Sequence, residues 1–271
     1  MKTLYLDLGM GAAGDMLTAA LLELMPDREE ALASLNGLGL PGVVYTTETA
    51  QKCGILGTHM HVRIHGQEEE PSQDLPGHGH EHEHAHVHGH MHEHAHEHEH
   101  AHSHTALADI QALVSGLSVS DNVKAQVLEV YDRIAQAESQ VHGVPVDRIH
   151  FHEVGSLDAL ADVTAVCYLL ERLAPEKIMA SPVQVGFGKT RCAHGILPVP
   201  APATARILLG VPIRAGDIPG ELCTPTGAAL LRQFVTDYGP MPLMTVERIG
   251  YGLGTKDFPA ANCLRAMLGT G

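Results

Sequence analysis

The chain of 271 residues contains no tryptophan, and only four Phe and six Tyr supply its aromatic side chains. Its 17 Lys and Arg are outnumbered by 32 Asp and Glu, which gives a formal net charge of −15. Nucleic-acid-binding proteins need a basic surface and often use aromatic side chains on which bases stack. The composition therefore indicates no nucleic-acid partner, while the length suffices for one large domain or two smaller ones.

The five cysteines are widely spaced and form no C-x-x-C pair. This spacing argues against a disulfide framework and against a thiolate zinc site. Long apolar runs are also missing, and Asp7 and Asp15 interrupt the N-terminal run that would otherwise resemble a signal peptide. We therefore expect free thiols, no membrane contact and a soluble cytoplasmic protein.

Basic residues are missing from the segment between Gly66 and His104, which carries nine acidic residues instead. Fourteen histidines there occupy every second position, separated by small residues and glutamates. Imidazole suits nickel, zinc, copper and cobalt ions, so the tract predicts capture or storage of a divalent transition metal. The alternative is a solvated low-complexity insertion with incidental metal affinity. The histidines of the tract are His78, His80, His82, His84, His86, His88, His90, His92, His94, His96, His98, His100, His102 and His104.

The same segment predicts how the chain is divided. Its residues are too polar to offset the entropy lost on folding, so we expect 66–104 to be a disordered metal-binding insertion. It separates an N-terminal α/β segment, residues 1–65, from a main α/β region, residues 105–271, that packs with it. The fold class is therefore α/β or α+β, and the sequence does not give the strand order.

Local patterns place the main elements around this insertion. A buried strand, a glycine-rich turn and a helix open the chain, and helices follow the insertion before a mixed region that Gly and Pro divide into short runs. Ser120 is suited to begin one helix and Gly143 to end it. The expected strands cover 3–8, 43–50 and 58–64, and the expected helices cover 14–24, 107–117, 121–142, 156–173 and 226–238.

The glycine-rich turn, residues 9–14, matches the G-x-G-x-x-G pattern of dinucleotide-binding proteins. However, Asp15 stands where a pyrophosphate would meet the helix, and no acidic residue closes a second strand at the expected spacing. A tight turn that holds Asp7 and Asp15 beside a pocket, near a metal or a metal–phosphate, fits the residues better. A plain strand–turn–helix connection is the other interpretation.

A second candidate site begins at His150. In an extended run, His150 and His152 share one face, and Ile149 and Phe151 share the opposite face. The following helix carries Asp158 and Asp162 four residues apart, on one side that continues with apolar residues. Imidazole and carboxylate together suit nickel, zinc, iron or manganese. The alternative is a set of structural polar groups, because a helix N-terminus stabilises negative charge.

Two further segments have the residues of an anion site. Lys189 and His194 lie between the glycine-rich loop 186–188 and the proline-rich run 198–202, and the rigidity of that run predicts a rigid wall for a binding site. In the segment 221–227, Thr224 or Thr226 is suited to cap a helix that Pro225 helps to start, and the N–H groups at such an end, including that of Gly227, bind phosphate well. Ordinary helix capping explains this second segment equally well.

Five ordered motifs across nearly the whole chain resemble the LarC nickel-insertion family. A histidine-rich insertion ahead of the second motif is also usual in that family. The motifs are Asp-x-Gly-x-Gly-Ala-Ala-Gly-Asp-Met (7–16), His-Phe-His-Glu-Val-Gly-Ser-x-Asp-Ala-x-x-Asp (150–162), Ala-His-Gly-x-Leu-Pro-Val-Pro-Ala-Pro-Ala-Thr (193–204), Glu-Leu-x-Thr-Pro-Thr-Gly-Ala-Ala (221–229) and Gly-Tyr-Gly-x-Gly-Thr-Lys-Asp (250–257).

The resemblance implies a lyase-class nickel chelatase. Such proteins insert Ni²⁺ into pyridinium-3,5-bisthiocarboxylic acid mononucleotide, consume CTP, and form the nickel-pincer cofactor of lactate racemase and related enzymes. Family members usually continue into a C-terminal module implicated in CTP binding, so we expect a C-terminal partner chain or module to be needed for full activity. The resemblance is also compatible with Mg²⁺ or Mn²⁺ bound beside CTP and with a homo-oligomer.

The roles of individual residues are inferred from residue type and spacing, and not from the resemblance. We expect His150, His152, Asp158 and Asp162 to hold the reactive nickel, with Asp7 and Asp15 as further metal candidates and the tract as bulk metal binder. Glu153 or His194 is the candidate base, because both types titrate near neutrality when perturbed. Lys189, Thr224, Thr226 and Gly227 are the candidates for binding the nucleotide. The alternative function is a nickel metallochaperone or storage protein without catalysis.

Overall fold

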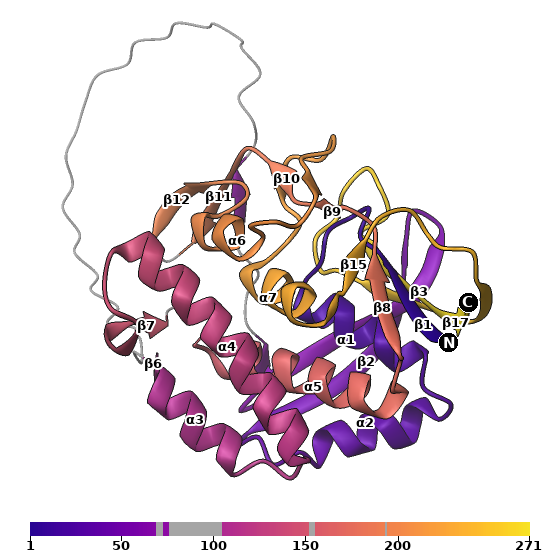
Figure 1. Cartoon of the computed structure of the whole chain (residues 1–271), viewed down its shortest axis with the longest axis horizontal. Coiled ribbons are helices and arrows are strands. Elements are labelled where there is room, and N and C mark those ends of the chain that lie inside the picture. Colours follow the sequence, from indigo (N-terminus) through magenta and orange to yellow (C-terminus); the bar gives the residue numbers. More distant parts are fainter. Residues whose placement is uncertain (69–72, 76–104, 152–154, 193) are drawn as a thin grey trace, which may run out of the picture.

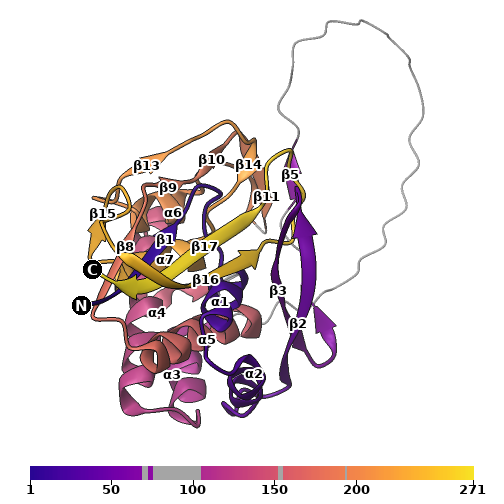
Figure 2. The ribbon, with the colours of Figure 1, turned by 90° about the vertical axis from the view of Figure 1, so that its right-hand side faces the viewer.

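The computed structural model describes residues 1–68, 73–75, 105–151, 155–192 and 194–271, and it has a mixed α/β architecture. Its main sheet has eight strands in the order β15-β8-β1-β17-β16-β3-β2, with β4 paired to β3 (Figures 1 and 2). β1 is parallel to β8 and antiparallel to β17, so the two ends of the chain lie side by side in the sheet. The strands are β1 (Lys2–Asp7), β2 (Val43–Lys52), β3 (Ile55–Ile64), β4 (Gln67–Glu68), β8 (Lys177–Ala180), β15 (Asp237–Tyr238), β16 (Thr245–Leu253) and β17 (Cys263–Thr270).

The helices pack in layers on this sheet. α1 lies against β16 and β3, and α5 packs on α1 (Figure 2). α4 packs on α5 and also on α3. The side chains of α5 are buried almost all round because α1, α4 and α7 surround it. The helices are α1 (Gly14–Glu23), α2 (Arg28–Asn36), α3 (Leu107–Ser115), α4 (Asp121–His142), α5 (Leu157–Leu173), α6 (Pro202–Ile207) and α7 (Pro225–Phe234), with a 3₁₀ turn at Val146–Arg148.

Four smaller sheets lie outside the main sheet in the described part of the chain. β11 pairs with β12 and with β5, so a segment from before the histidine tract lies beside one that follows α5. The other pairs are β10–β14, β9–β13 and β6–β7. Their bounds are β5 (Gln73–Leu75), β6 (Thr105–Ala106), β7 (His150–Phe151), β9 (Val183–Gln184), β10 (Gly186–Phe187), β11 (Lys189–Cys192), β12 (Gly195–Pro198), β13 (Ile213–Arg214) and β14 (Gly220–Glu221).

The mixed α/β class and most of the expected elements are confirmed. Ser120 caps α4 by accepting a hydrogen bond from Val123 N at 3.1 Å, and Gly143 ends the helix with a φ of 67°. Ile149 and Phe151, which were expected on one face, are both buried. These elements follow local rules of capping and periodicity, which the sequence contains directly.

Two expectations were wrong in detail. The helix expected over 226–238 ends at Phe234, because Asp237–Tyr238 instead pairs with β8 as β15. The segment expected to be disordered from Gly66 contains β4 and β5, which pair with β3 and β11. Both differences come from pairing with distant strands. Among the described helices, none has the length and apolar character needed to span a membrane.

Candidate functional site

A cavity of about 570 Å³ lies where the N-terminal ends of α1, α5 and α7 converge. The loop between β16 and β17 closes another side, and Glu68 of β4 lies at the wall. A helix N-terminus carries about half a positive charge, so three such ends create a strongly polar wall. The polar side chains on the cavity wall are Asp15, Glu68, Ser156, Asp158, Asp162, Glu221, Thr224, Thr226, Thr255, Lys256 and Asn262.

The glycine-rich turn positions α1 at this cavity. Gly11 has a φ of 82°, and a Cβ there would lie 1.9 Å from the carbonyl oxygen of Leu222. Ala12 N donates to Leu222 O at 3.0 Å, and Thr224 N donates to Ala12 O at 3.1 Å. The turn therefore pairs with the segment before α7 and sets the two helix N-termini side by side. This packing explains why Gly11 is needed without any dinucleotide.

Gly14 leaves room for a carboxylate over the start of α1. A Cβ at Gly14 would lie 2.3 Å from Oδ2 of Asp162, whose side chain is buried. The helix dipole stabilises a negative charge at this place. Asp162 therefore has a structural role at the α1–α5 contact while it also borders the cavity.

Asp15 borders the cavity on one side and is surrounded by protein on the others. Burial raises the pKa of its carboxyl to about 6, and the negative charge of Glu68 acts in the same direction. The backbone N–H groups of Met16 and of Asp15 itself, which bond to the carboxylate, oppose this rise. Asp15 is therefore a carboxyl group that exchanges its proton close to neutral pH.

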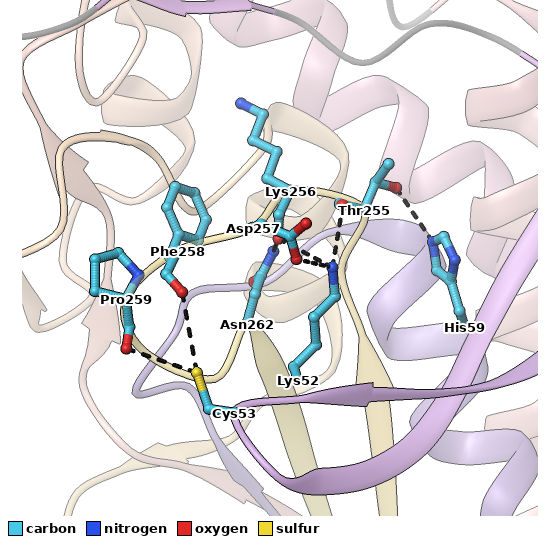
Figure 3. Close-up of polar contacts among 9 residues, drawn as sticks. All are labelled: Lys52, Cys53, His59, Thr255, Lys256, Asp257, Phe258, Pro259 and Asn262. Atoms are coloured by element: carbon cyan, nitrogen blue, oxygen red, sulfur yellow. Dashed lines mark hydrogen bonds and ion pairs between the residues drawn. The ribbon is translucent and has the colours of Figure 1, made fainter.

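The loop between β16 and β17 is held from behind by the β2–β3 hairpin (Figure 3). Lys52 Nζ donates to the carbonyl oxygens of Thr255 and Lys256 at 3.3 and 3.4 Å and pairs with Asp257 Oδ1 at 2.6 Å. Asn262 Nδ2 donates to the same Lys256 carbonyl at 2.8 Å. These bonds fix the backbone around Lys256, while its side chain extends away from the cluster in Figure 3 and borders the cavity.

The structure brings five of the candidate residues to one place. Asp15, Asp158, Asp162, Thr224 and Thr226 all line the cavity, although the sequence placed them in three separate motifs. Gly227 lies directly behind it, since a Cβ there would be 2.2 Å from Ala12 O.

Three other candidates lie elsewhere. Asp7 pairs with Arg265 at 2.6 Å, Lys189 is exposed on β11, and neither lines the cavity. His194 lies outside the cavity wall beside His142, with ring centroids 4.8 Å apart.

The predicted histidine ligands fall largely outside the described residues. The backbone of His150 belongs to β7, whereas His152, Glu153 and the whole tract from His78 to His104 lie outside the described part of the chain. Within the described part, no three His, Cys, Asp or Glu side chains form a group that could hold a metal ion. The metal assignments therefore stay predictions.

The sequence analysis missed Glu68, Glu221, Lys256 and Asn262 as cavity residues. Glu221 and Lys256 lie within motifs that carried the family resemblance, so that signal was present. Glu68 and Asn262 had none, because their place depends on β4 pairing with β3 and on the turn before β17.

The comparisons with known proteins identify the family of the chain. A family model described as nickel insertion protein matches residues 4–271. Two similar proteins, both called pyridinium-3,5-bisthiocarboxylic acid mononucleotide nickel insertion protein, come from Desulfitobacterium hafniense, at 40% identity, and Geobacillus kaustophilus, at 38%. A putative nickel insertion protein of Geotalea daltonii is 36% identical. Each alignment covers 99% of this chain.

The chain spans 58% to 61% of the length of these relatives. No solved structure matches it. The family model covers all five motifs and every described residue that lines the cavity. The chain belongs to the nickel insertion protein family.

Proposed function

We propose that this chain inserts Ni²⁺ into pyridinium-3,5-bisthiocarboxylic acid mononucleotide, the compound named for its relatives. The observation that carries the proposal is the 40% identity to such a protein over 99% of the chain. The cavity supports it, because about 570 Å³ is within the usual range for a small-molecule site. CTP as co-substrate, with Mg²⁺ or Mn²⁺ beside it, belongs to the same proposal.

In the insertion step, the C4–H bond of the pyridinium ring breaks and its electron pair forms the carbon–nickel bond. The proton must pass to a base. Glu153 is the better of the two candidates, because it stands three residues before Ser156 on the cavity wall, whereas His194 lies elsewhere. His150, His152, Asp158 and Asp162 are the proposed nickel ligands, and the carboxylates of the cavity wall offset the charge of the arriving cation.

The decisive assay mixes the purified chain with Ni²⁺, CTP and the bisthiolated mononucleotide, with and without the remaining part of a longer relative. Formation of the nickel cofactor is followed by mass spectrometry. We expect His152→Ala to abolish insertion while the denaturation midpoint and the bulk nickel capacity stay unchanged. A destabilised but fully active variant would overturn the metal-site assignment.

A nickel reservoir without catalysis is the second candidate, favoured by the histidine tract alone. Deleting residues 78–104 separates the two functions. An insertion enzyme keeps its turnover at saturating Ni²⁺ after the deletion, whereas a reservoir loses its only activity. Loss of all cofactor formation in the deleted chain at saturating Ni²⁺ would favour the reservoir.

A further inference from the structure

We propose that the first turn of α7, together with Lys256, binds the phosphate group of the mononucleotide. This inference rests on the proposed function for the identity of the nucleotide. The phosphate-binding chemistry of the subsite does not depend on that function. The ligand class is a phosphate monoester carried on a ribosyl pyridinium. Thr226 supplies the central contacts.

The backbone donors at the start of α7 leave one group without a partner. Thr224 N donates to Ala12 O, residue 225 is a proline without an N–H, and Gly227 N donates to Thr224 Oγ1 at 3.1 Å. The N–H of Thr226 therefore has no partner among the described residues. Unpaired donors at a helix N-terminus are the usual place for a phosphate group.

The side chain of Thr226 gives an independent indication. Its residue is 8% exposed, it lines the cavity, and its hydroxyl makes no hydrogen bond to any described residue. This hydroxyl is not one of the fully buried oxygens without a partner, so it is accessible from the cavity, where an anionic ligand oxygen is placed to accept its proton. The N–H and the O–H of Thr226 thus offer two hydrogen-bond donors to the oxygens of one ligand group.

Lys256 adds the positive charge that a phosphate dianion requires. It borders the same cavity, and Lys52 and Asn262 hold its backbone in place (Figure 3). The carboxylates of the wall are Asp15 on α1, Asp158 and Asp162 on α5, Glu68 on β4 and Glu221 on β14, and Lys256 is the one cationic side chain among the described lining residues. The substrate has one cationic group, the pyridinium nitrogen, and its phosphate and two thiocarboxylates are anionic. The phosphate therefore needs a cationic partner, and Lys256 is placed to supply it.

The test measures binding of nicotinate mononucleotide, its riboside without phosphate, and inorganic phosphate to the whole chain by calorimetry. We expect the mononucleotide to bind at least about tenfold more tightly than the riboside, as charge-assisted hydrogen bonds predict. Thr226→Val and Lys256→Met should each weaken mononucleotide binding about tenfold and leave riboside binding unchanged. Thr226→Ser, which keeps the hydroxyl, should retain the affinity.

Matched controls exist for both variants. Thr204 is also buried with a hydroxyl that has no hydrogen-bond partner, but it lies on α6 and not on the cavity wall, so Thr204→Val should bind normally. Lys124→Met removes an exposed charge on α4 with the same expectation. Equal binding of mononucleotide and riboside, no binding of the mononucleotide at millimolar concentration, or unchanged affinity in folded Thr226→Val would each overturn the subsite.

The nickel insertion assay separates this subsite from the proposed function. Insertion with an unchanged KM in Thr226→Val would reject the phosphate subsite and leave the function standing. Phosphate-dependent binding without any insertion would support the subsite and reject the function. Inorganic phosphate that competes as well as the mononucleotide would overturn the assignment to a nucleotide.

Discussion

Asp15 and Asp162 are two carboxylates at the first turn of α1, and their surroundings differ. Asp162 fills the space that Gly14 leaves open over the helix N-terminus. Asp15 belongs to the turn itself, and burial raises the pKa of its carboxyl to about 6. Burial therefore opposes the ionisation of Asp15 more strongly than the local N–H groups favour it.

This pKa predicts how stability depends on pH. A carboxyl whose pKa is raised in the folded state from 3.8 to about 6 favours folding below pH 4 and loses that contribution as pH rises through 6. The difference is at most about 3 kcal/mol, and water in the cavity reduces it. Asp15→Asn removes the titration, and its amide oxygen still accepts the backbone hydrogen bonds.

We therefore expect the free energy of unfolding of Asp15→Asn to exceed that of the wild type at pH 7.5 and to converge with it near pH 4. Urea denaturation across this range gives the comparison. Asp27→Asn, at the exposed cap of α2 and away from the cavity, serves as the control. A constant difference between the Asp15→Asn variant and the wild type at all pH values would contradict the role given to burial.

At the scale of elements, the β2–β3 hairpin supports the wall of the site. Its tip reaches the β16–β17 loop, where Lys52 bonds to two backbone carbonyls and Cys53 Sγ lies 3.6 Å from the carbonyl oxygen of Pro259. His59 extends the contact, with Nε2 3.2 Å from Thr255 Oγ1. An exposed ion pair alone adds little stability, so the carbonyl bonds matter more than the partner Asp257.

Lys52→Met is expected to loosen this loop without unfolding the protein. Amide hydrogen exchange over residues 255–262 should become faster, mononucleotide binding should weaken several-fold, and the free energy of unfolding should fall by only about 1 kcal/mol. Asp257→Asn keeps the two carbonyl bonds of Lys52 and should change exchange much less. Equal effects of both substitutions would show that the ion pair, not the carbonyl bonds, holds the loop.

At the scale of the whole molecule, we expect the histidine tract and the cavity to perform separable tasks. The tract contains fourteen potential ligands but too few apolar residues to contribute to a core. We expect it to bind several Ni²⁺ or Zn²⁺ ions, with an affinity that falls below about pH 6 as imidazole becomes protonated. Its deletion should remove this capacity.

Calorimetry and thermal unfolding test this separation on the same preparation. Nickel binding by the tract should shift the melting temperature of the intact chain very little, because a segment with so few apolar residues is not expected to contribute to the core. The chain without residues 78–104 should melt at nearly the same temperature as the intact chain. One tight nickel site accompanied by a large rise in melting temperature would contradict the expected separation of the tract from the cavity.

The sequence by itself determined the elements that depend on neighbours along the chain. The Ser120 and Ser156 caps, the Thr224 cap and the αL ending at Gly143 follow from residue type at fixed spacing. The burial of α5 followed from its apolar surface, and the family followed from five ordered motifs. Each of these features can be predicted from interactions between residues close in the sequence or from a sequence motif.

Only the tertiary structure decided which motifs share a site. Asp15, Asp158 and Thr226 meet because α1, α5 and α7 begin at one cavity, whereas Lys189 and His194 lie outside its wall. Lys256 joins them through a loop that the β2–β3 hairpin holds. Such contacts join residues more than two hundred positions apart, and the free energy that selects them comes from strand pairing and packing that no local pattern records.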